Sequence, residues 1–80
     1  MVLIVDDDYL VRALLALLVK RIGLTSIEAS GGREALGLLK KREMRPGLII
    51  CERSMPEMDG LEFLRACKQG GALRDTYPLS

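Results

Sequence analysis

The segment VLIVDDDY at residues 2–9 sets the fold class of this 80-residue chain. Its first four residues, Val2–Val5, form a continuous apolar run of the kind that makes a strand buried on both faces. Three acids follow at once, and Asp8 is placed to cap a helix that begins with the next apolar residues. A buried strand that leads directly into a helix is typical of an α/β protein with a parallel sheet.

The same strand–helix unit occurs three times along the chain. Since the first and third apolar runs contain no polar residue and the second does, we expect the second strand at an edge of the sheet. The sequence therefore predicts a parallel sheet with strand order 2-1-3, connected by right-handed crossovers. The expected strands are Val2–Val5, Thr25–Ala29 and Leu48–Cys51, and the expected helices are Leu10–Ile22, Arg33–Arg42 and Leu61–Lys68.

The composition excludes several classes of protein. A hydrophobic content of 49% excludes intrinsic disorder, and the absence of His excludes His–Asp catalytic pairs and almost all zinc catalysis. A net charge of +1 indicates neither a nucleic-acid nor a membrane partner. Cys51 and Cys67 lack the spacing of a redox motif and predict reduced, buried thiols. No signal peptide precedes the first strand, so we expect a cytoplasmic protein. As a separate expectation, the protein is not an enzyme.

Acidic residues follow two neighbouring strands of the predicted sheet. Asp6, Asp7 and Asp8 come after the first strand and Glu52 after the third. In an open α/β sheet, ligands bind at the carboxyl ends of the strands where the strand order reverses. Clustered carboxylates at that edge suit Mg²⁺. In the alternative interpretation, Asp8 is only a helix cap, and the other two aspartates only interact favourably with the helix dipole.

Two long segments resemble the receiver domain of bacterial response regulators: VLIVDDDYLVRALL at residues 2–15 and PGLIICERSMPEMDGLEFL at residues 46–64. EASGGREAL at residues 28–36 resembles the family's second strand-to-helix turn. The resemblance implies a three-layer, flavodoxin-like receiver fold and a role in two-component (phosphorelay) signalling. The family continues with a completed fourth strand, a fourth helix, a fifth strand and a fifth helix. We therefore expect residues 1–80 to be a single, truncated receiver-like domain.

The resemblance also implies roles for individual residues. Asp7 matches the family's direct Mg²⁺ ligand, and Asp6 matches its neighbour, which acts through water. The third ligand is a backbone carbonyl, here that of Ser54. Pro56 and Gly60 match the loop that shapes the site. We expect Mg²⁺ binding at these positions to be weak.

Glu52 stands where the family has its phosphoacceptor aspartate. The extra methylene displaces the carboxylate, and a misplacement of about 1 Å can cost on the order of 10²-fold in rate. We expect a degenerate receiver that does not accept a phosphoryl group and that binds a histidine kinase or another response regulator. Three alternatives stay open: a constitutive mimic of the phosphorylated state through Glu52, a receiver that keeps Mg²⁺-dependent phosphorylation, and a non-functional remnant or fragment.

The apolar pattern also predicts self-association. We expect Val11, Leu15, Leu18 and Ile22 to pack on the sheet, leaving a second stripe of the first helix in water. The third strand would be an open edge of the kind that recruits other strands. In the alternative, the tail Ala72–Ser80 folds back and covers that edge. The predicted result is a homodimer with its interface at Leu10, Leu14, Leu17, Leu48 and Ile50.

Overall fold

The computed structural model describes residues 1–41, 46–55, 57–69 and 77–79. Strands and helices alternate in the order β1 (Val2–Val5), α1 (Tyr9–Arg21), β2 (Ser26–Ala29), α2 (Gly32–Lys41), β3 (Leu48–Cys51), α3 (Gly60–Gln69) and β4 (Tyr77–Leu79). The three predicted strand–helix units are confirmed, with boundaries shifted by one residue at most where the structure describes them. The predicted end of the second helix at Arg42 lies outside the described residues.

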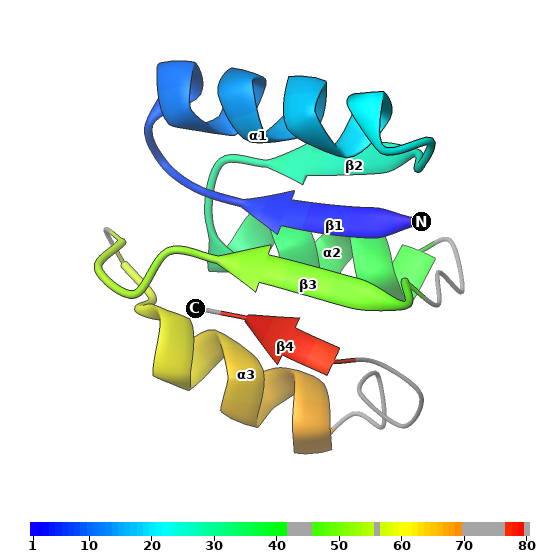
Figure 1. The fold of residues 1–80 in the computed structure, drawn as a ribbon. Coiled ribbons are helices and arrows are strands. Elements are labelled where there is room, and N and C mark those ends of the chain that lie inside the picture. Colours follow the sequence, from blue (N-terminus) through cyan, green and yellow to red (C-terminus); the bar gives the residue numbers. More distant parts are fainter. Residues whose placement is uncertain (42–45, 56, 70–76, 80) are drawn as a thin grey trace.

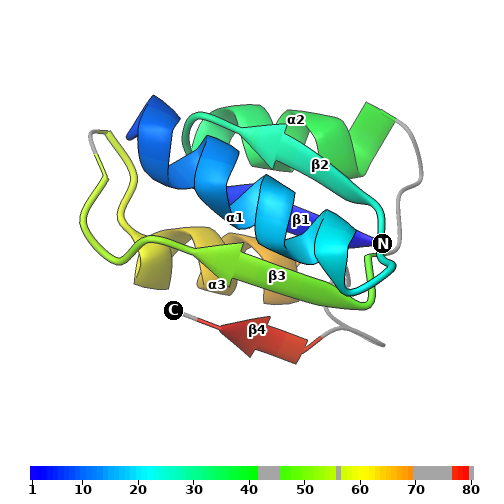
Figure 2. The same ribbon diagram turned by 45° about the horizontal axis from the view of Figure 1, so that its top comes forward.

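The sheet is parallel, and its strands lie in the order β2-β1-β3-β4 (Figure 1). Val2–Val5 pairs with Ser26–Ala29 on one side and with Leu48–Cys51 on the other. The predicted order 2-1-3 and the edge position of β2 are therefore confirmed. The three layers are α1, the sheet, and the pair α2 and α3 (Figure 2).

The expectation that β3 is an open edge is wrong. Tyr77–Leu79 pairs in parallel with Leu48–Ile50, so the tail folds back onto the sheet as the alternative proposed. The backbone of β3 is thereby paired on both sides. Pro78 has no N–H to donate to a ladder, which suits an edge strand.

The two faces of the sheet bury different sets of side chains. Under α2 and α3, the core contains Leu3, Val5, Ile49 and Phe63, with Phe63 fully buried. Under α1, a smaller core contains Val2, Ile4 and Val19, with Leu48 and Ile50 partly buried against it. α1 covers this second face, and α2 and α3 cover the first (Figure 2).

The orientation predicted for α1 is confirmed at Leu15 and wrong at the other three positions. Leu15, Ala16 and Val19 face the sheet, whereas Val11 is 40%, Leu18 49% and Ile22 73% exposed. Most positions of α1 are apolar, so periodicity alone does not select its buried face. Arg12 selects it, because its guanidinium reaches back to the end of β1 and to β2, as described below. The predicted exposure of Leu10, Leu14 and Leu17 is confirmed.

Both ends of α1 are closed by local hydrogen bonds. The Asp8 carboxylate accepts from the N–H groups of Leu10 (2.9 Å) and Val11 (3.3 Å), which confirms it as the cap. At the other end, Gly23 has φ +86°, and its N–H donates to the carbonyl of Lys20. The N–H of Leu24 donates to Val19, completing the Schellman arrangement that glycine favours after a helix. None of the helices in the described part of the chain is long and apolar enough to cross a membrane.

Cys51 and Cys67 are free and buried, as predicted. The pKa of each thiol is raised to about 11, mainly by burial, and for Cys51 this rise includes a contribution from Cys67 and nearby carboxylates. Both thiols are therefore neutral in the folded chain at neutral pH.

We predict that the chain loses stability as the pH rises from about 9 to 11. The folded pKa of each thiol lies above the unfolded value of 9.0, so the unfolded chain releases these protons first. The free energy of unfolding should fall by up to about 1.4 kcal/mol per pH unit for each thiol. Urea denaturation at several pH values measures this slope. A Cys51→Ala, Cys67→Ala variant should show a flatter profile, and an identical slope in the two proteins would refute the assignment.

Candidate functional site

The carboxyl ends of β1 and β3 lie side by side, which brings the predicted acidic residues to one edge of the sheet. Val5 is the register partner of Cys51, and the N–H of Glu52 donates to the carbonyl of Val5 at 2.9 Å. The N–H of Asp6 donates to Ala29 at the end of β2. We call this edge, formed by the described residues Asp6–Asp8, Glu52–Met55 and Glu57–Asp59, the acidic rim.

Asp6 is buried at the centre of the acidic rim, with 5% of its surface exposed. Its carboxylate accepts from the N–H of Asp8 at 2.8 Å, so it holds the turn that leads into α1. Its backbone carbonyl accepts from Nη1 of Arg12 at 2.7 Å. Part of the binding capacity of Asp6 is therefore used by its own turn.

Arg12 is a site residue that the sequence interpretation missed. Its Nε lies 3.3 Å from Oε1 of Glu28, and its guanidinium lies over the Tyr9 ring, 5.6 Å from the centroid. Together with its bond to the Asp6 carbonyl, these contacts join β1, α1 and β2. No motif marks this role, because the three partners meet only in the folded chain.

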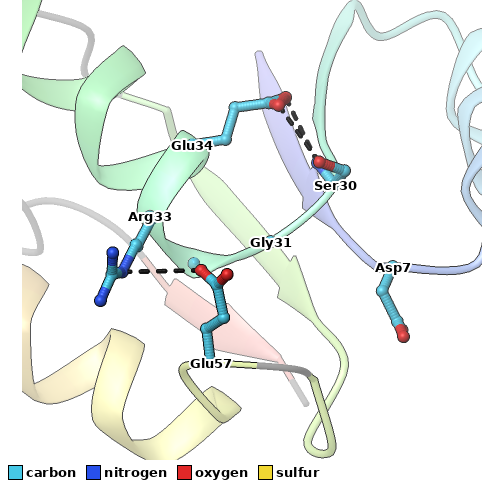
Figure 3. A pocket seen from close by; sticks show the side chains of 7 residues that line it. Asp7, Ser30, Gly31, Arg33, Glu34 and Glu57 are labelled. Atoms are coloured by element: carbon cyan, nitrogen blue, oxygen red, sulfur yellow. Dashed lines mark hydrogen bonds and ion pairs between the residues drawn. The ribbon is translucent and has the colours of Figure 1, made fainter.

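Asp7 is exposed and lines a cavity of about 320 Å³ between the acidic rim and the start of α2 (Figure 3). Across this cavity, Nε of Arg33 lies 3.7 Å from Oε2 of Glu57. Ser30 donates from its hydroxyl and its N–H to the Glu34 carboxylate, at 3.2 and 3.3 Å. Ser30 and Gly31 therefore form the entry to α2, which begins at Gly32.

The carboxylate of Glu52 is turned onto its own loop. Oε1 accepts from the N–H of Arg53 at 2.8 Å and from the N–H of Ser54 at 3.4 Å. Glu52 is not among the residues that line the cavity beside Asp7. The position that the resemblance assigns to the phosphoacceptor is therefore occupied by a carboxylate with one oxygen hydrogen-bonded to the backbone beside it.

Gly60 fixes the shape of the β3–α3 loop. Its N–H donates to the carbonyl of Arg53 at 2.9 Å, and an added Cβ would lie 2.8 Å from the carbonyl oxygen of Glu52. Only glycine allows this approach of backbone to backbone. Pro56, the other residue expected to shape the loop, lies outside the described residues.

In the loop before α3, the backbone of Glu57 has a φ of +70°. Asp59 begins α3 through a reciprocal pair of hydrogen bonds with Glu62. The pair of bonds is a capping box, which satisfies the N–H groups of Asp59 and Glu62. Asp59 therefore has a structural role at the border of the acidic rim.

The carboxylates of the acidic rim fit a metal ion that keeps most of its water. They do not fit a site in which protein ligands surround the ion. Among the residues that the structure describes, no three or more His, Cys, Asp or Glu side chains gather closely enough to hold a metal ion. Asp7 has the accessible carboxylate, Asp6 is partly engaged, and Glu52 is turned away onto its loop. Mg²⁺ bound by one or two carboxylates keeps most of its water, and this donor set fits that mode.

The chain is similar in sequence to known proteins of two-component signalling. The chain is 37% identical over 67 residues to Sporulation initiation phosphotransferase F of Bacillus subtilis, covering 84% of this chain and 52% of that protein. It is 40% identical over 68 residues to a two-component response regulator of Arabidopsis thaliana, covering 85% and 48%. It thus spans about half the length of these two relatives. A sensor histidine kinase of Helicobacter pylori matches at 39% identity over 62 residues, which are 78% of this chain and 8% of the kinase.

The chain is also similar in fold to solved receiver structures. The chemotaxis protein CheY4 of Vibrio cholerae superimposes with a TM-score of 0.87 at 31% identity, covering 96% of this chain and 62% of that chain. A receiver domain protein from Methanospirillum hungatei gives a TM-score of 0.86 at 31% identity, covering 96% and 60%. The family model for the response regulator receiver domain matches residues 2–76. With its parallel 2-1-3 core and its acidic rim at the carboxyl ends of β1 and β3, the chain belongs to the response regulator receiver family.

Proposed function

We propose that this receiver is a protein-interaction module of two-component signalling that does not accept a phosphoryl group. The observation that carries the proposal is the position of Glu52, whose carboxylate is bound by the N–H groups of Arg53 and Ser54. In-line attack on phosphorus requires a carboxylate oxygen that is placed within a fraction of an ångström and free to react. The longer arm moves both oxygens of Glu52 away from the place of an aspartate carboxylate, and Oε1 is also held by its own backbone.

A second candidate function is a permanent mimic of the phosphorylated state. An anionic oxygen held by two backbone N–H groups is a fixed negative charge at the acidic rim. A full phosphoryl group carries more charge and three acceptor oxygens, so the mimicry would be partial. In this candidate, as in the first, the chain does not accept a phosphoryl group.

The partners that we propose are a histidine kinase or another response regulator. A matching segment lies within a sensor histidine kinase, and another relative is named as a response regulator. We propose that the module acts in the cytoplasm, where the free thiols of Cys51 and Cys67 stay reduced. It works by binding and not by catalysis.

We also propose that the module is a constitutive homodimer. Leu10, Leu14 and Leu17 are 75%, 56% and 55% exposed, which supports their predicted place in the interface. Leu48 and Ile50 are partly buried against the core under α1. We therefore propose that they lie at the margin of the dimer interface and not at its centre. An apolar interface of this kind needs no phosphoryl group to form.

We predict that the wild-type chain forms no acyl phosphate when incubated with acetyl phosphate and Mg²⁺. Intact-mass spectrometry at neutral pH should show one unmodified mass for wild type and for Glu52→Gln. Glu52→Asp removes the extra methylene, and an adduct on this variant alone would assign the block to the length of the side chain. An adduct on wild type that is lost in Glu52→Gln would contradict the proposal.

We predict a millimolar dissociation constant for Mg²⁺, because few carboxylates at the acidic rim are free to bind it. Calorimetry or an NMR titration measures the constant. Asp7→Asn should abolish measurable binding. The neighbouring Asp8→Asn is the matched control, since Asn also caps a helix, and it should weaken binding only slightly. A micromolar constant would show a better-built site than the structure contains.

A further inference from the structure

Arg12 is a mostly buried cation beside the acidic rim. Its side chain is 15% exposed, whereas the other two charged residues of α1, Lys20 and Arg21, are exposed. Its Nη1 donates to the backbone carbonyl of Asp6 at 2.7 Å, and its Nε lies 3.3 Å from Oε1 of Glu28. On charge alone, a cation at this place lowers the affinity of the neighbouring carboxylates for a metal ion. Its location is therefore better explained by the backbone that it holds than by its charge.

Two hydrogen bonds to Asp6 fix the turn between β1 and α1. The Asp6 carboxylate accepts from the N–H of Asp8 at 2.8 Å, and the Asp6 carbonyl accepts from Arg12 at 2.7 Å. This carbonyl belongs to the peptide group that leads into Asp7, and a peptide group is planar. Arg12 therefore sets the direction in which the backbone enters Asp7, the residue whose exposed carboxylate lines the cavity (Figure 3).

Glu28 on β2 holds Arg12 in this position. Glu28 is the register partner of Ile4, whose side chain is buried under α1, so both side chains lie on the α1 face of the sheet. A guanidinium presents its N–H donors in a rigid plane, so the bond to Glu28 also fixes the direction of Nη1 toward Asp6. Glu28 is not among the residues that line the cavity. β2 thus supports the acidic rim through Arg12, without a carboxylate of its own in the cavity.

We infer that Arg12 is a positioning residue of the Mg²⁺ site, because it holds the backbone from which Asp7 reaches the ion. It acts through the Asp6–Asp8 turn and not by contacting the ion. The inference rests on the weak Mg²⁺ site proposed above and is independent of the absence of phosphorylation. The charge of Arg12 disfavours a bound cation, whereas its hydrogen bond to Asp6 favours the site. The sign of the change in affinity when Arg12 is replaced separates these two effects.

An NMR titration with Mg²⁺ alone tests this sign. Arg12→Met removes the charge and the donors but keeps an unbranched side chain. The charge effect predicts tighter binding by this variant, whereas lost positioning predicts a dissociation constant raised on the order of tenfold. Arg12→Lys keeps the charge but not the planar fork, so its constant should lie between those of wild type and Arg12→Met. Arg21→Met is the matched control, since it removes an exposed cation from the other end of α1, and it should stay within about twofold of wild type.

A constant for Arg12→Met at or below that of wild type would overturn the inference. If Arg12→Met does not fold, Arg12→Lys decides, and a constant equal to that of wild type would overturn the inference in the same way. If wild type binds no Mg²⁺, the proposed metal site and this inference both fail, and the proposed absence of phosphorylation is unaffected.

Hydrogen exchange without metal tests whether the turn itself changes. The N–H of Asp8 is bonded to the Asp6 carboxylate, and its exchange should be faster on the order of tenfold in Arg12→Met. The N–H of Glu52, which donates to Val5, should stay protected and reports that the sheet is intact. An unchanged rate at Asp8 would overturn the inference. Equal acceleration at both amides in Arg12→Met and in Arg12→Lys would show a purely structural role and would overturn it as well.

Discussion

Burial of β1 from both faces is the constraint on which the rest of the molecule depends. Its residues, Val2–Val5, are each at most 2% exposed. Such a strand needs a neighbour on each side and a helical layer on each face. β2 and β3 supply the neighbours, α1 supplies one layer, and α2 with α3 supplies the other (Figures 1 and 2). Because the pairing is parallel and in register, the loops after β1 and β3 emerge together and form the acidic rim.

The features that were predictable from sequence are those set by local pattern. Continuous apolar runs predicted β1 and β3, Asp8 marked the start of α1, and the polar character of β2 predicted its edge position. The side of α1 that packs on the sheet was not predictable from local pattern. Its apolar residues surround most of the helix, and Arg12 orients it through partners at residues 6 and 28. Such a tertiary contact leaves no periodic signal.

The edge of the sheet and the use of the acids also required the structure. The pairing of Tyr77–Leu79 with β3 involves only three residues, too few for a strong strand pattern. The sequence located Asp6, Asp7 and Glu52 at one edge but did not indicate what each carboxylate binds. In the folded chain Asp6 holds the turn to α1, Glu52 holds the β3–α3 loop, and Asp7 alone of the three lines the cavity. The three carboxylates therefore have different roles, although they lie at the same edge of the sheet.

We propose a receiver that works by binding a partner, with Oε1 of Glu52 hydrogen-bonded to its own loop. The most direct test is the ¹H–¹⁵N spectrum of the chain with Mg²⁺, recorded before and after addition of acetyl phosphate. The account predicts that the amide signals of Arg53 and Ser54 stay in place when the phosphodonor is added. A second set of signals for Glu52–Met55, which appears with the donor and decays as an acyl phosphate hydrolyses, would contradict it.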